Sequence, residues 1–101
     1  KDTKTHSIVI IIDITKNKTA TVKDSAGKIL EYRILLSSNI IIKDYLTDDE
    51  ILNHNFSYSS TYRVQDRYSE TIKLENKAIK DLINKIYQNL LIKLSESILT
   101  T

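Results

Sequence analysis

The chain of 101 residues contains no cysteine, proline, methionine or tryptophan, and its only glycine is Gly27. Without cysteine it can form neither a disulfide framework nor a thiolate metal site. A single glycine excludes a glycine-rich phosphate-binding loop and the Gly-x-Ser-x-Gly turn of serine hydrolases. Turns must therefore be built from Asp, Asn, Ser and Lys, and long uninterrupted elements are the expected consequence.

Charge and apolar runs are also limited. The net charge is +2 and the pI is near 8.8, without the clustered basic excess of most nucleic-acid binders. The longest apolar run, Ile8–Ile12, is too short to cross a bilayer. Length and composition are those of one folded domain, residues 1–101. Because the sequence begins at Lys1 and lacks methionine, we expect a trimmed product whose signal peptide or lipid anchor would lie upstream.

Alternation of apolar and polar residues predicts strands in the first half of the chain. Residues 6–15 carry isoleucine at each even position from Ile8 to Ile14, which is typical of a strand with one apolar face. The polar letters TKNK at 15–18 predict a turn, followed by a weaker strand over 19–24. A hairpin turn at 25–28 then leads into one long strand over 28–45.

The stretch "NHNFSYSSTYRVQDRYSE" (53–70) raises the question whether it is a loop, an active segment or a strand. Its even positions include Phe56, Tyr58 and Tyr62, so we predict a strand over 52–62 with the aromatics facing the core. The odd positions form an uncharged polar ladder: Asn53, Asn55, Ser57, Ser59 and Thr61. From about Ser69 to Ser97 the apolar period becomes helical.

These elements predict an α+β fold with the order β-β-β-β-α: an antiparallel or mixed four-stranded sheet with a long C-terminal helix packed on one face. Four strands span about 19 Å, whereas one helix covers only about 10 Å. We therefore expect part of the isoleucine-rich face to stay uncovered, and either a partner or a second helix upstream to cover it.

No pattern in the sequence predicts catalysis. His6 and His54 are far apart and lack a spaced acidic or cysteine partner, so neither a metal site nor another cofactor is expected. The acidic run 48–50 fits a solvated turn better than a calcium loop. No nucleophile stands beside a recognisable base, and we expect the protein not to be an enzyme.

Aromatic and basic residues interleave between Tyr58 and Tyr68, which invites comparison with nucleic-acid-binding surfaces. A stacking platform needs its aromatics on an exposed sheet face beside a basic groove. Here Phe56, Tyr58 and Tyr62 fall on the predicted core side, which favours a structural role. Weak binding of nucleic acid remains only as a third hypothesis.

The uncharged ladder is unusual because exposed strands normally carry Lys or Glu, which also prevent edge pairing. One explanation for the absence of charge is chance together with the amino-acid composition of the chain. The other is that this surface packs against another neutral polar surface, where a charge would be costly to desolvate.

Two longer stretches carry a resemblance. The run "EYRILLSSNIIIKD" (31–44) is similar to the Arg/Tyr-rich long strand of the lipopolysaccharide-assembly lipoproteins (LptE type), which ends in a Leu/Ile-x-Asp turn. The run "FSYSSTYRVQDRYSETIKLENKAIKDLINKIYQNLLIKL" (56–94) resembles their Ser-Tyr-Ser strand end, the tyrosine before the helix, and the long helix. The likeness extends from Glu31 to Leu94, roughly two thirds of the chain.

Members of that family are outer-membrane lipoproteins with two helices on one face of a mixed four-stranded sheet. They plug the β-barrel of the lipopolysaccharide translocon from its periplasmic side, help the barrel assemble, and contact lipopolysaccharide. The resemblance implies an LptD-like barrel partner, a lipid anchor in the full-length protein, and a first strand and helix upstream of Lys1. It makes the ladder the candidate barrel contact, and Arg63, Arg67 and Lys73 the candidates for lipid A phosphates or acidic sugars. The alternative is a general α+β interaction module that forms a homodimer through its sheet face.

Overall fold

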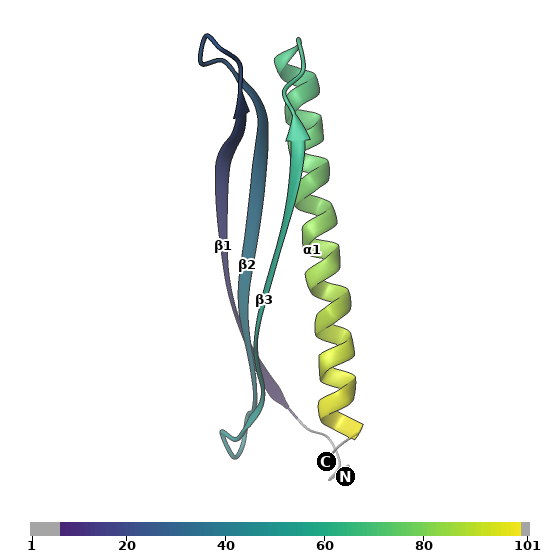
Figure 1. The fold of residues 1–101 in the computed structure, drawn as a ribbon. Helices are drawn as coiled ribbons and strands as arrows, with labels where there is room; N and C mark the ends of the chain where they lie inside the picture. The colour runs from purple at the N-terminus through teal and green to yellow at the C-terminus, as the bar shows by residue number, and fades with distance from the viewer. Residues whose placement is uncertain (1–6, 100–101) are drawn as a thin grey trace.

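The computed structural model describes residues 7–99, which form three strands and one helix. They are β1 (Ile8–Lys23), β2 (Ile29–Asp44), β3 (Glu50–Arg63) and α1 (Tyr68–Leu99). The strands form an antiparallel meander in the order β1-β2-β3, and α1 runs back alongside β3 (Figure 1). The molecule is elongated, with principal extents of 67 × 21 × 20 Å. The α+β class and the long C-terminal helix are thus confirmed.

The prediction of a fourth strand is wrong within residues 7–99. The two stretches assigned to separate strands, 6–15 and 19–24, are parts of the single strand β1 from Ile8 to Lys23, and Asp24 belongs to the turn that follows. The expected turn stays extended, and Thr15 to Lys18 pair in register with Ser37 to Ile34 of β2. No glycine or proline in that segment forces the chain to turn, and the 16-residue β2 offers a continuous row of hydrogen-bonding partners. Polar side chains are tolerated there because β1 is an exposed edge strand. Both described strand pairs are antiparallel, so no mixed sheet is present among them.

Aspartates close both hairpin turns. Asp24 Oδ1 accepts hydrogen bonds from the backbone N–H groups of Ala26 and Lys28, both at 2.9 Å, and Gly27 supplies the positive φ of 86° that this turn requires. Asp44 Oδ1 accepts from the N–H of Leu46 at 2.8 Å and of Thr47 at 3.0 Å. Aspartate is suited to this role because its short side chain can bond the backbone two residues further on.

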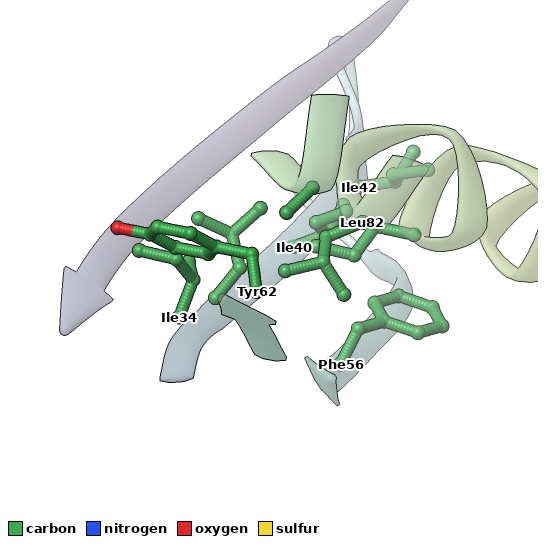
Figure 2. Close-up of a cluster of buried hydrophobic side chains, with 9 residues drawn as sticks. Ile34, Ile40, Ile42, Phe56, Tyr62 and Leu82 are labelled. Atoms are coloured by element: carbon green, nitrogen blue, oxygen red, sulfur yellow. The ribbon is translucent and has the colours of Figure 1, made fainter. Parts of the chain in front are cut away.

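The core lies between α1 and the even-numbered face of β2 and β3, as the alternation predicts. Ile34, Ile40 and Ile42 are at most 2% exposed, and α1 covers them with Leu82 and its neighbours (Figure 2). The remaining buried apolar residues are Leu36, Phe56, Tyr62, Ala78 and Ile86. In Figure 2 the hydroxyl of Tyr62 lies at the edge of this cluster, where a polar group can find a partner.

The helix covers β3 and β2 but leaves β1 uncovered. Ile12 of β1 and Ile40 of β2 are cross-strand neighbours, yet Ile12 is 51% exposed and Ile40 only 2%. On α1, Leu82 and Ile86 are buried in the core, whereas Ile83 and Tyr87 are exposed. Their side of the helix faces away from the covered strands, so they lack a sheet surface to pack on.

Candidate functional site

The polar ladder of β3 lies on the face of the sheet opposite the helix. All five of its residues are exposed, whereas Phe56 and Tyr62, which alternate with them, are buried. The predicted outward orientation is therefore confirmed. The members of the ladder are Asn53, Asn55, Ser57, Ser59 and Thr61.

Strand register extends this polar surface beyond β3. Asn55 pairs with Asn39 of β2, which pairs with Asp13 of β1. In the next row Ser57, Ser37 and Thr15 are aligned in the same way, and the Ser37 and Ser57 hydroxyls are 3.1 Å apart. The outer polar face is consequently three strands wide.

Sequence reasoning found only the β3 part of this face. The odd positions of β1 and β2 carried the same period-two signal, but no sequence pattern states which residue of one strand lies opposite which residue of the next. The mistaken turn at 15–18 also placed Thr15 at the end of its strand rather than within it.

A second, apolar surface lies at the end of the molecule that contains Ile8. The even-numbered isoleucines of β1 are 46% to 54% exposed on the same side of the sheet as α1: Ile8, Ile10, Ile12 and Ile14. Val9 and Ile11, on the opposite face, are 37% and 43% exposed. A strand with apolar residues on both faces is typical of a position inside a sheet rather than at its open edge.

The exposed apolar residues of α1 continue this surface. Glu75 contacts Lys18 of β1, which identifies the side of the helix nearest to β1. Ile79, Ile83 and Tyr87 follow Glu75 at four-residue steps, each of which turns about 40° further round the helix, so Ile79 lies next to that side and Ile83 and Tyr87 lie progressively further from it. Ile83 is 48% and Tyr87 59% exposed. We call β1 from Ile8 to Ile14 together with Ile83 and Tyr87 the open apolar surface.

A polar cluster closes the opposite end of the gap between β1 and α1. Lys18 Nζ donates a hydrogen bond to Glu75 Oε1 at 2.7 Å, and the Tyr62 hydroxyl donates to the same oxygen at 2.5 Å. Lys18 also lies 4.4 Å above the centre of the Tyr32 ring, which stacks on Tyr62 with 5.8 Å between centroids. Nothing in the sequence pattern predicted this cluster.

These contacts shift the ionisation of all three groups that share the hydrogen bonds. The hydrogen bond to Glu75 raises the pKa of Lys18, and the hydrogen bond from Lys18 lowers the pKa of Glu75. Burial, and then the bond to Glu75, raises the pKa of Tyr62 to about 12. The cluster is thus held as ammonium, carboxylate and neutral phenol, an arrangement suited to joining β1 to α1.

The three basic candidates lie where β3 ends and α1 begins, but they do not converge on one point. Arg63 Nη1 is 4.0 Å from Glu31 Oε1, and Lys73 Nζ is 3.6 Å from Glu70 Oε2. Arg67 is exposed in the connection, and its carbonyl accepts from the N–H of Glu70 at 3.1 Å and of Thr71 at 3.2 Å. Two of these cations therefore already have a carboxylate partner.

The histidines do not assemble a metal site among residues 7–99. The ring of His54 packs against Phe56 with 4.6 Å between centroids, and His6 lies outside the described residues. No group of three or more His, Cys, Asp or Glu side chains gathers in this part of the chain. In the same part, no helix is both long and apolar enough to span a bilayer.

Comparison with protein-family models and with curated proteins finds no match to this chain. Its function must therefore be argued from its two exposed surfaces and from the resemblance noted in its sequence.

Proposed function

We propose that this chain is a non-enzymatic subunit of the lipopolysaccharide translocon. It acts on the periplasmic side of the outer membrane, where it plugs the translocon β-barrel and assists barrel assembly. The resemblance of residues 31–44 and 56–94 to the lipopolysaccharide-assembly lipoproteins supports this choice.

The observation that carries the proposal is the uncharged ladder on the outer face of β3. Five consecutive outward positions of an edge strand lack any charge, and the adjoining positions of β2 add Ser37 and Asn39. Burying such a face against another polar surface avoids the cost of desolvating unpaired charges. The interior of a porin-type barrel is a surface of this kind.

Co-expression with the barrel tests the proposal. The full-length protein should co-purify with an LptD-like barrel, and Ser57→Lys together with Asn55→Glu should reduce recovery of the complex. Ser57 and Asn55 are exposed, so the fold should persist, which circular dichroism will check. Failure of the wild-type protein to co-purify with the barrel would refute the proposal.

Contact with lipopolysaccharide is assigned to the basic residues at the β3–α1 junction. Charge-assisted hydrogen bonds to phosphate are strong, so the double variant Arg67→Glu and Lys73→Glu should weaken capture by immobilised lipopolysaccharide. Lys93→Glu is the matched control, because Lys93 is also paired with a carboxylate, Glu96 at 3.8 Å, but lies toward the other end of α1. Equal capture of the double variant and the wild type would rule out this role.

A second candidate function, an α+β module that dimerises through its sheet face, is favoured by the open apolar surface. Several isoleucines that are about half exposed are unusual in a soluble monomer. Sedimentation should then reveal a concentration-dependent dimer that Ile12→Lys disrupts. A monomer at all concentrations would exclude this candidate.

A further inference from the structure

A shallow depression of about 390 Å³ lies in the middle of the outer face. Its outward-facing lining consists of short polar side chains: Asp13, Thr15, Ser37, Asn39, Asn55 and Ser57. The next outward positions along β1 and β2 carry larger residues, Ile11 and Ile41 on one side and Leu35 on the other. The hollow therefore results from a change in side-chain size within a continuous sheet.

The depression has acceptors that no described residue satisfies. Asn39 Oδ1 is buried and has no hydrogen-bond partner. The carboxylate of Asp13 forms no ion pair with any residue among 7–99. The Ser37 and Ser57 hydroxyls share a single hydrogen bond between them, which leaves further acceptor capacity.

The cations of the outer face are too far away to supply the missing donors. Arg33 and Lys43 of β2 are six and four residues from Asn39, or about 20 and 13 Å at 3.3 Å per residue. Lys43 Nζ is moreover 3.8 Å from Asp48 Oδ1. The centre of the outer face is consequently electronegative, although the chain as a whole carries a net charge of +2.

We infer that this depression seats the guanidinium group of an arginine supplied by the protein that covers the outer face. A guanidinium presents five N–H donors in one plane and can bond a carboxylate through two of them. It can therefore pair with Asp13 while its other edge reaches the amide oxygen of Asn39, once that amide turns about its last side-chain bond. A single carboxylate is too little charge for a divalent cation. The one aromatic residue of the lining, Phe56, has its side chain buried in the core on the helix side of the sheet, so it offers no ring for a sugar to stack on.

The inference deepens the proposed function and rests on it only for the source of the arginine, an inward-facing residue of the barrel wall. The binding chemistry itself can be measured on the isolated chain. The full chain, labelled with nitrogen-15, is titrated with an acetylated and amidated Gly-Arg-Gly peptide while the side-chain amide signals of Asn39 and Asn55 are followed. Two matched probes serve as controls. Gly-Lys-Gly keeps the positive charge but changes the donor geometry, and Gly-citrulline-Gly removes the charge.

The arginine peptide should shift both amide signals saturably with millimolar affinity. The lysine peptide should bind several-fold more weakly, and the citrulline peptide should cause no saturable shift. Asp13→Asn should weaken arginine binding at least tenfold, whereas Asp81→Asn, which removes an exposed carboxylate of α1, should leave it unchanged. Equal shifts with arginine and citrulline, or an Asp13→Asn variant that binds like the wild type, would overturn the inference.

The two proposals fail separately. If the protein co-purifies with the barrel but the Asn39 and Asn55 amide signals do not shift with the arginine peptide, the arginine site is refuted and the proposed function stands. Saturable arginine binding without co-purification would refute the translocon role and leave the site in place.

Discussion

Lys18 of β1 and Glu75 of α1 are 57 residues apart in sequence, and their side chains meet at 2.7 Å. The same carboxylate oxygen accepts a hydrogen bond from the Tyr62 hydroxyl at 2.5 Å. Beyond this point α1 packs on β3 and β2 alone. The pair therefore holds the edge strand to the helix at one end of the molecule, while the other end stays open.

Replacing Glu75 should show how much this cluster stabilises the fold. Glu75→Gln removes the charge and leaves the part-buried Tyr62 hydroxyl with a weaker acceptor, so we expect a loss of about 1–3 kcal/mol. Urea unfolding measures it. Glu70→Gln is the control, since the Glu70–Lys73 pair is exposed and should contribute less than about 1 kcal/mol. Equal effects of the two substitutions would contradict the assigned role.

The same cluster should make the stability of the fold depend on pH in both acid and alkali. The folded pKa of Glu75 is below its ordinary value of 4.5. Its contribution is therefore present above pH 4.5 and lost as the pH falls through the folded pKa. The urea midpoint of the wild type should drop on acidification below that value, and Glu75→Gln should flatten this part of the curve. If the urea midpoint of Glu75→Gln falls with acidification as much as that of the wild type, Glu75 is not the source of the acid sensitivity.

At alkaline pH the cluster makes stability fall as the pH rises, the reverse of its effect in acid. Tyr62 has its pKa raised from 10.0 to about 12, and that of Lys18 is raised above 10.5. Both contributions are present below these ordinary values and decline as the pH rises through the folded ones. We expect one of the six tyrosines to ionise near pH 12, as measured by tyrosinate absorbance, and Tyr62→Phe to remove that late step. If the late ionisation step persists in Tyr62→Phe, it belongs to another tyrosine.

Ile12 and Ile40 offer a matched comparison of the covered and uncovered halves of the sheet. They are cross-strand neighbours on one face, 51% and 2% exposed. Ile40→Ala should cost about 2–5 kcal/mol because it leaves a cavity in the core. Ile12→Ala should cost less than about 1 kcal/mol in the isolated chain, as is usual for exposed positions. Similar losses in urea unfolding would mean that β1 is covered in solution, for instance by a second copy.

Ser38 is a polar residue in the core, 2% exposed and aligned with Phe56 of β3. Its hydroxyl oxygen has no hydrogen-bond partner. Because a buried unsatisfied hydroxyl costs free energy, Ser38→Ala should leave stability unchanged or raise it by about 1 kcal/mol. Ser37→Ala, which removes the 3.1 Å contact with Ser57, should instead lower stability by about 0.5–1.5 kcal/mol. Thermal unfolding distinguishes the two, and a clear loss in Ser38→Ala would reveal a partner for that hydroxyl.

The type of each element and the side to which its residues point were predictable because both depend on local periodicity. The alternation of Phe56, Tyr58 and Tyr62 with polar residues was enough to assign β3 and its two faces. The conformation of the segment from Thr15 to Lys18 was not predictable, because its polar residues by themselves suit a turn. Only the continuous pairing offered by β2, and the carboxylate of Glu75 for Lys18, keep it extended.

The stretch from Asn53 to Glu70 illustrates the same division. By itself, the sequence determined that Phe56, Tyr58 and Tyr62 face inward, that the polar ladder faces outward, and that a helix follows, because neighbouring residues decide these properties. Tertiary structure decided that the outward residues align with Asn39 and Asp13 into one polar depression, and that β1 stays uncovered. Those relations depend on strand register and on where a single helix can lie, and both arise only when distant segments pack together.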